Sequence, residues 1–262
     1  DLWACGARVD SAQAIVTLLV LEAAEQQELL VQTLCGVRSV LEEQQAQLIG
    51  GHTLESRSEL PHCPSLGVQL SLCVNGRSAA PWSKGGIAHG DVLLLSRPLG
   101  TGVLFAAAMA GACQPEALDT VLLQMCRSQH RLLDQLEPHR QAIHACTDVT
   151  GFGLLGHLGE MLASSSPLRI TLWTNRIPAY PEAMDRLAQG YASSLAPANS
   201  RSWRWLDGPI QLDVSPSQAL LELLVDPQTC GPLLLACPET TAQTLTAEGP
   251  WIPIGNATAD HG

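Results

Sequence analysis

Asp148 and Thr150 are the first candidates for a functional site. They lie two residues apart, where an apolar run meets a glycine-punctuated helix. The run at 143–149 predicts a short strand, and side chains two positions apart in a strand lie on one face. A carboxylate beside a hydroxyl would suit a magnesium ion, which prefers oxygen ligands and often accompanies phosphate. The competing interpretation is that Asp148 or Thr150 caps the helix predicted at 151–164, and spacing alone favours the cap.

Gly151 and Gly153 follow directly and have two interpretations of their own. They would let a ligand approach the backbone, beside a helix N-terminus whose N–H groups attract anions. They would equally permit close packing against a neighbouring segment. The local pattern leaves both interpretations open.

Gly50, Gly51, His52 and Thr53 form a second candidate group at the end of a strand predicted from residue 47. Backbone N–H groups freed at the two glycines would hold a phosphate, with His52 as a nucleotide contact. Taken alone, the segment is better explained as a plain glycine turn followed by a polar loop residue.

Arg97, Gly100, Thr101 and Gly102 lie between a predicted strand and a predicted helix, within 93–103. This loop would cradle an anion with Arg97 as the counter-charge. It lacks the lysine and the glycine spacing of a P-loop, so no Walker-type site is predicted.

Asp226, Gln228 and Thr229 lie between a predicted helix and a predicted strand, and we interpret them as an ordinary turn. Cys230 has no histidine or basic residue near it in sequence, so it is no better a nucleophile candidate than any other thiol here.

Alternating strands and helices must position these groups, and they predict an α/β or α+β protein in two lobes. A turn-rich stretch at 77–90 is the candidate boundary between the lobes. Predicted strands lie at 12–21, 46–51, 66–76, 91–96, 143–149, 168–174, 232–238 and 251–258. Predicted helices lie at 25–45, 100–111, 115–136, 151–164, 180–190, 216–225 and 239–249.

Composition excludes several classes of function. A net charge of −11, from 14 basic and 25 acidic residues, argues against nucleic acid as a bulk partner. The apolar stretches are too short to span a bilayer, so no membrane partner is expected. The nine cysteines are scattered and include no CxxC pair, which indicates free thiols in a reducing cytoplasm.

Five segments together resemble selenophosphate synthetase, the selenide, water dikinase family. They are "DLWACGA" (1–7), "LIGGHT" (48–53), "GDVLLLSRPLGTGV" (90–103), "TDVTGFGLLGHLGEM" (147–161) and "DPQTCGPLLLACP" (226–238). The resemblance implies the two-lobed fold of aminoimidazole ribonucleotide synthetase, with mixed sheets covered by helices. Residues 1–78 would be the remainder of an N-terminal ATP-binding and dimerisation lobe, and residues 88–262 the C-terminal lobe.

The resemblance also implies an activity and its site residues. The family makes selenophosphate, AMP and phosphate from selenide, ATP and water, as a homodimer with Mg²⁺. Asp1 matches a metal and ATP ligand of the family, and Asp148 matches the magnesium aspartate of the other lobe. Gly50, Gly51, His52 and Thr53 match the run that contacts ATP. On this ground the metal interpretation of Asp148 replaces the cap.

The chain departs from the family in its catalytic groups. The catalytic cysteine or selenocysteine and the catalytic lysine of the family would lie upstream of residue 1, so no residue here is assigned a catalytic role. Arg97 replaces the lysine of a Thr-Lys-Pro-Leu-Gly segment. We expect a fragment of a longer protein, inactive alone, with a flavin oxidoreductase-like domain fused upstream. The alternatives are a non-catalytic ATP-binding or dimerisation module and a sister ATP-dependent synthetase or kinase of the same superfamily.

Overall fold

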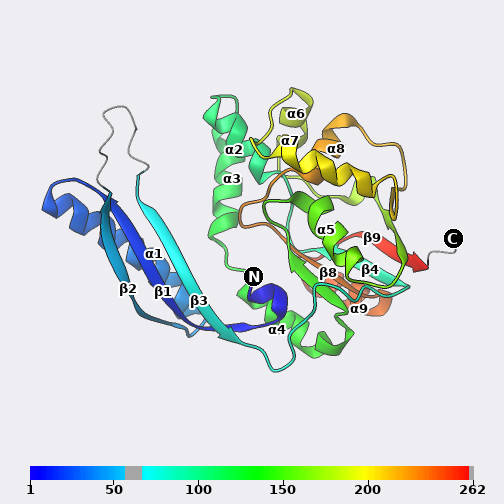
Figure 1. The fold of residues 1–262 in the computed structure, drawn as a ribbon, viewed down its shortest axis with the longest axis horizontal. Helices are drawn as coiled ribbons and strands as arrows, with labels where there is room; N and C mark the ends of the chain where they lie inside the picture. Colours follow the sequence, from blue (N-terminus) through cyan, green and yellow to red (C-terminus); the bar gives the residue numbers. More distant parts are fainter. Residues whose placement is uncertain (57–66, 260–262) are drawn as a thin grey trace. The chain divides into compact units, whose positions relative to one another are not determined.

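The computed structural model describes residues 1–56 and 67–259, and the chain divides into two compact units (Figure 1). The smaller unit holds Leu2 and residues 6–80, and the larger unit holds Asp1, Trp3–Cys5 and residues 81–262. Within the described residues, no helix combines the length and the apolarity needed to cross a bilayer.

The smaller unit is a three-stranded sheet, in the part of the chain that is described, with one long helix packed on it. The strand order is β2-β1-β3, and β1 is parallel to β2 but antiparallel to β3. The elements are β1 (Arg8–Leu19), α1 (Ala23–Glu43), β2 (Gln47–Ser56) and β3 (Gln69–Arg77). Alternation along β1 turns Ala12 toward α1, where it joins Val37 and Leu41 in the core of this unit.

The larger unit contains a six-stranded mixed sheet in the order β5-β8-β4-β9-β6-β7. Its strands are β4 (Asp91–Leu95), β5 (Ala145–Asp148), β6 (Leu168–Leu172), β7 (Ile210–Leu212), β8 (Leu233–Pro238) and β9 (Ile252–Ala259). Its helices are α2 (Thr101–Met109), α3 (Pro115–Cys126), α4 (His130–Leu136), α5 (Gly153–Ala163), α6 (Ala183–Ala188), α7 (Ala196–Asn199), α8 (Gln218–Val225) and α9 (Glu239–Glu248). Short 3₁₀ turns lie at Trp3–Cys5, Glu137–Ala142, Thr174–Arg176 and Ser200–Trp205.

Strand β4 divides the larger unit into two cores. Leu93 and Leu95 point into the cluster that contains residues of α2, α5 and α8, whereas Leu94 points into the cluster with α4 and α9. A central strand covered on both faces buries every residue, which explains the unbroken apolar run of β4. The α/β class predicted from the sequence is confirmed.

The single helix predicted at 115–136 is wrong, since the chain forms α3 and α4 with a break at 127–129. Arg127 adopts an extended conformation, and its carbonyl accepts a hydrogen bond from Nη2 of Arg97 (3.0 Å). The Ser128 hydroxyl accepts from the His130 N–H (3.4 Å). Side-chain hydrogen bonds of this kind compete with helical ones, so periodicity alone did not reveal the break.

Candidate functional site

Asp148 is the last residue of β5, and its position at the strand end brings a carboxylate to the surface of the larger unit. Ala145, Cys146 and Thr147 are buried, whereas the Asp148 side chain is 25% exposed. The strand pairs with β8 through Leu233, so the backbone at Asp148 is fixed in the sheet. The carboxylate is therefore accessible to a ligand on a rigid element.

The turn at 149–152 carries the chain from Asp148 into α5 and is held by hydrogen bonds from two distant segments. The Val149 N–H donates to the Pro232 carbonyl (2.8 Å), and the Gln228 N–H donates to the Thr150 carbonyl (3.0 Å). The Asn199 amide donates to the carbonyls of Gly151 (2.7 Å) and Val225 (3.0 Å). The conformation beside Asp148 is thus set by long-range contacts.

Thr150 lies beyond the end of β5, so the prediction that it shares a strand face with Asp148 is wrong. Its N–H donates to Nε2 of His157 (3.1 Å), and its hydroxyl oxygen lies 3.1 Å from the same nitrogen. Burial lowers the pKa of His157, which keeps the ring neutral and Nε2 an acceptor. Helix α5 begins at Gly153 without any side-chain cap, so the cap interpretation is wrong too.

The two glycines of the turn differ in their surroundings. A Cβ on Gly153 would lie 2.7 Å from the Val225 backbone, and the residue has φ of +69°. Gly153 therefore serves close packing between α5 and the end of α8. A Cβ on Gly151 would have no atom within 4 Å. Only Gly151 leaves open space beside the backbone.

Asp1 and Asp148, the predicted metal residues, lie near one another in the larger unit. The backbone nitrogen of Asp1 is 3.6 Å from a carboxylate oxygen of Asp148, and the Asp1 side chain is fully exposed. Ala4, in the adjoining 3₁₀ turn, packs in the same core cluster as Cys146. Among the described residues, no group of three or more His, Cys, Asp or Glu side chains is arranged to hold a metal ion.

Gly50, Gly51, His52 and Thr53 lie in the smaller unit, inside β2, so the glycine turn predicted there is wrong. Strand β2 pairs with β1 through all four residues, because Gly51 allows the Ala14 carbonyl to approach. A Cβ on Gly51 would lie 1.9 Å from that oxygen. The four residues line a surface pocket of about 330 Å³, and β2 is an edge strand whose outer backbone groups have no partner strand among the described residues.

The anion cradle predicted around Arg97 is already filled by the protein. The N–H groups of Gly100 and Thr101 donate to Oε1 of Gln228 (3.0 and 3.3 Å). Nη1 and Nη2 of Arg97 donate to the carbonyls of Cys230 and Arg127, both at 3.0 Å. Arg97 is therefore a buried structural residue and provides no counter-charge to a ligand.

The Asp226 carboxylate also occupies a backbone N–H group of this loop, at the N-terminus of α2. Its Oδ2 accepts from the Gly102 N–H (3.1 Å) and from Nε2 of Gln228 (3.0 Å). Burial raises the pKa of Asp226 to about 7. Asp226 and Gln228, interpreted as part of an ordinary turn, are thus buried residues that hold both α2 and the turn after Asp148, whereas Thr229 is exposed.

Asn199, His157 and Gln228 support the Asp148 turn, and none was predicted to do so. Asn199 is the last residue of the short helix α7, in a part of the chain (191–214) where the sequence predicts no helix or strand. His157 lies on α5 and accepts a hydrogen bond from the Thr150 N–H, but Thr150 precedes the helix, so helical spacing does not predict the pair.

The comparisons with known proteins identify the class of this fold. The structure matches thiamine-monophosphate kinase from Stenotrophomonas maltophilia K279a with a TM-score of 0.68 at 18% identity, covering 100% of this chain and 73% of that one. It matches a hydrogenase maturation protein HypE in complex with ATP with a TM-score of 0.65 at 17% identity, covering 98% and 68%. These similarities show the aminoimidazole ribonucleotide synthetase-like fold.

The sequence gives a narrower assignment. Residues 88–262 match the AIR synthase related protein, C-terminal domain, and the chain belongs to that family. It is 34% identical over 210 residues to a selenide, water dikinase from Desulfitobacterium hafniense, which covers 80% of this chain. The matched region spans 57% of that relative's length.

Proposed function

We propose that this chain is the ATP- and Mg²⁺-binding body of a selenophosphate synthetase. The complete reaction converts selenide, ATP and water into selenophosphate, AMP and phosphate, with the catalytic cysteine or selenocysteine and the lysine supplied by residues outside this chain. The observation that carries the proposal is the Asp148 carboxylate, held at the end of β5 within the segment that resembles the family most specifically. The similarity to curated selenide, water dikinases supports it.

The residues of the Asp148 region fit a magnesium ion that arrives with phosphate. Phosphoryl transfer depends on positioning and on neutralised charge more than on covalent work by the protein. Mg²⁺ is bound by one or two carboxylates plus substrate phosphates, which suits Asp148 and Asp1. The ion would offset the repulsion between ATP and a chain of net charge −11. Asp148, on its fixed turn, would orient the ion. Nucleotide contact by Gly50, Gly51, His52 and Thr53 of the smaller unit rests on the family resemblance alone.

Titration calorimetry with ATP tests this assignment. We expect Mg²⁺-dependent ATP binding by the chain, and at least about tenfold weaker binding by Asp148→Asn, because a charge-assisted contact of about 1.4 kcal/mol is lost. Asp119→Asn, an exposed aspartate on α3, is the matched control and should bind ATP like the wild type. Equal ATP binding with and without Mg²⁺, or equal binding by Asp148→Asn, would contradict the assignment.

The products of ATP turnover separate the competing functions. Joined to the upstream residues, the chain should release AMP in proportion to added selenide. ADP release that is indifferent to selenide would favour a sister kinase, and binding without turnover would favour a non-catalytic module.

All eight described cysteines are free thiols, which supports a reducing cytoplasm as the setting.

We further propose that the smaller unit forms a homodimer interface. Leu70, Leu72 and Val74 on the edge strand β3 are 42%, 45% and 39% exposed. Exposed apolar side chains on an edge strand favour association with another chain. A flavin oxidoreductase-like domain fused upstream remains part of the proposal for the complete protein.

A further inference from the structure

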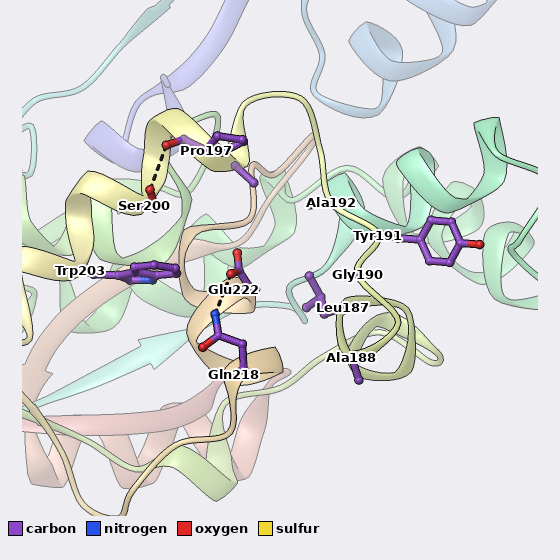
Figure 2. A pocket seen from close by; sticks show the side chains of 11 residues that line it. Leu187, Ala188, Gly190, Tyr191, Ala192, Pro197, Ser200, Trp203, Gln218 and Glu222 are labelled. Atoms are coloured by element: carbon purple, nitrogen blue, oxygen red, sulfur yellow. Dashed lines mark hydrogen bonds between the residues drawn. The ribbon is translucent and has the colours of Figure 1, made fainter.

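A second pocket lies in the larger unit between α6, α7, α8 and the 3₁₀ turn at Ser200–Trp205 (Figure 2). Its volume is about 480 Å³, which falls in the range of small-molecule sites. None of the residues assigned above to ATP or magnesium lines it. We call it the α8 pocket.

The wall of the α8 pocket is largely apolar and rigid. Leu187 and Ala196 are 6% and 5% exposed, so they are anchored in the core. Nε1 of Trp203 donates to the Leu221 carbonyl (3.0 Å), which fixes the indole and leaves its ring carbons to meet a ligand. The Ser200 hydroxyl is engaged as well, since it donates to the Pro197 carbonyl (2.9 Å).

Glu222 is the only charged residue among the described residues that line the α8 pocket. Nε2 of Gln218, one helical turn earlier on α8, donates to Oε1 of Glu222 (2.8 Å) and orients the carboxylate. Figure 2 shows the carboxylate projecting between Trp203 and Leu187, while the Tyr191 ring points away. A carboxylate beside apolar and aromatic walls, with no basic side chain lining the pocket, is complementary to a cation.

We propose that the α8 pocket binds a small organic cation, a protonated amine that carries a flat apolar group. The ammonium would donate to Glu222, and the apolar group would pack against Trp203 and Leu187. Without a bridging metal ion, the same carboxylate repels a phosphate-bearing ligand, so this site is chemically distinct from the proposed ATP site. The inference does not depend on the proposed function.

Titration calorimetry without ATP or Mg²⁺ tests the proposal with three probes of similar shape. These are 2-phenylethylamine as the cation, 2-phenylethanol as the neutral counterpart and phenylacetate as the anion. We expect the amine to bind at least about tenfold more tightly than the alcohol, since the charge-assisted hydrogen bond is made only by the amine. Phenylacetate should not bind.

Three variants assign the binding to this pocket. Glu222→Gln should reduce the preference for the amine to less than about twofold, because the charge is removed while the shape is kept. Glu116→Gln, an exposed glutamate on α3 outside the pocket, should retain the full preference. Ala192→Trp places a large side chain from an exposed lining position into the pocket and should abolish binding of both the amine and the alcohol.

The proposal is overturned by any of four results. They are no binding of the amine, equal binding of amine and alcohol, a preference that survives Glu222→Gln, and binding unchanged by Ala192→Trp. Because ATP and Mg²⁺ are absent, none of these results bears on the role of Asp148.

Discussion

Asp226 illustrates how far the surroundings of one residue can change its chemistry. The side chain is 1% exposed, and its hydrogen-bond donors are the backbone N–H of Val103, the Gln228 amide and the backbone N–H of Gly102. These bonds favour the ionised form, but burial has the larger effect and raises the pKa to about 7. Between about pH 4 and pH 7, the Asp226 carboxyl group is therefore protonated in the folded chain but ionised in the unfolded chain.

A pH-dependent stability follows from Asp226. Because the folded-state pKa lies above the unfolded value, the free energy of unfolding should fall as pH rises from about 4 to about 7, by up to about 4 kcal/mol. Asp226→Asn cannot titrate and should lose this part of the slope. Urea unfolding across this pH range measures it.

Asp119→Asn is the control for that series, since this exposed aspartate should leave the slope unchanged. A slope that is the same in Asp226→Asn as in the wild type would show that folding does not raise the pKa of Asp226.

The glycines of helix α5 are needed because neighbouring side chains and backbone pack closely against the helix. Gly153, Gly156 and Gly159 would place a Cβ within 2.7 Å, 2.7 Å and 2.2 Å of Val225, Phe152 and Trp205, respectively. The motif is thus mainly a packing surface, and Gly151 is the one glycine among Gly151, Gly153, Gly156 and Gly159 whose added Cβ would meet open space. The alternative that glycines permit close packing was right for Gly153 and does not apply to Gly151.

Alanine substitutions at Gly153 and Gly151 should separate the two roles. Gly153→Ala should lower the free energy of unfolding by about 2–4 kcal/mol, from the left-handed backbone and the overlap with Val225. Gly151→Ala should change it by no more than about 0.5 kcal/mol, because the added methyl group meets open space.

Urea denaturation of both variants beside the wild type checks this prediction. Equal losses at the two positions would mean that the turn, and not the contact with Val225, sets the requirement for glycine.

At the scale of the whole molecule, the smaller unit leaves apolar strand residues uncovered in the described chain. Helix α1 covers Ala12, Ala14 and Val16 of β1, but Leu72, which pairs with Ala14, remains exposed. A second copy of the chain would bury such residues, which is why we propose the homodimer.

Substitution of Leu72 tests the homodimer. Leu72→Glu should weaken self-association by at least about tenfold, because a charge would be buried in an apolar interface. Leu123→Glu places the same charge at an exposed leucine of α3 and should leave association unchanged. Sedimentation equilibrium measures both, and a wild type that is monomeric at every concentration would refute the interface.

Most elements could be predicted from the sequence, because their apolar periodicity is local. Strand β4 and helices α5 and α8 lie close to the predicted ranges, since each buries a regular pattern of leucines. The break between α3 and α4 and the continuation of β2 beyond Gly51 could not be predicted. Both depend on partners distant in sequence, Arg97 and Ala14.

By itself, the sequence determined the α/β class, the family resemblance and the position of Asp148 at a strand end, because these follow from residue types and local spacing. Only the tertiary structure decided that Asp226 and Gln228 fill the loop at Arg97, that Asn199 and His157 hold the Asp148 turn, and that Glu222 faces a pocket. The physical reason is that hydrogen bonds and burial depend on contacts between segments distant in sequence, and local sequence patterns do not specify those contacts.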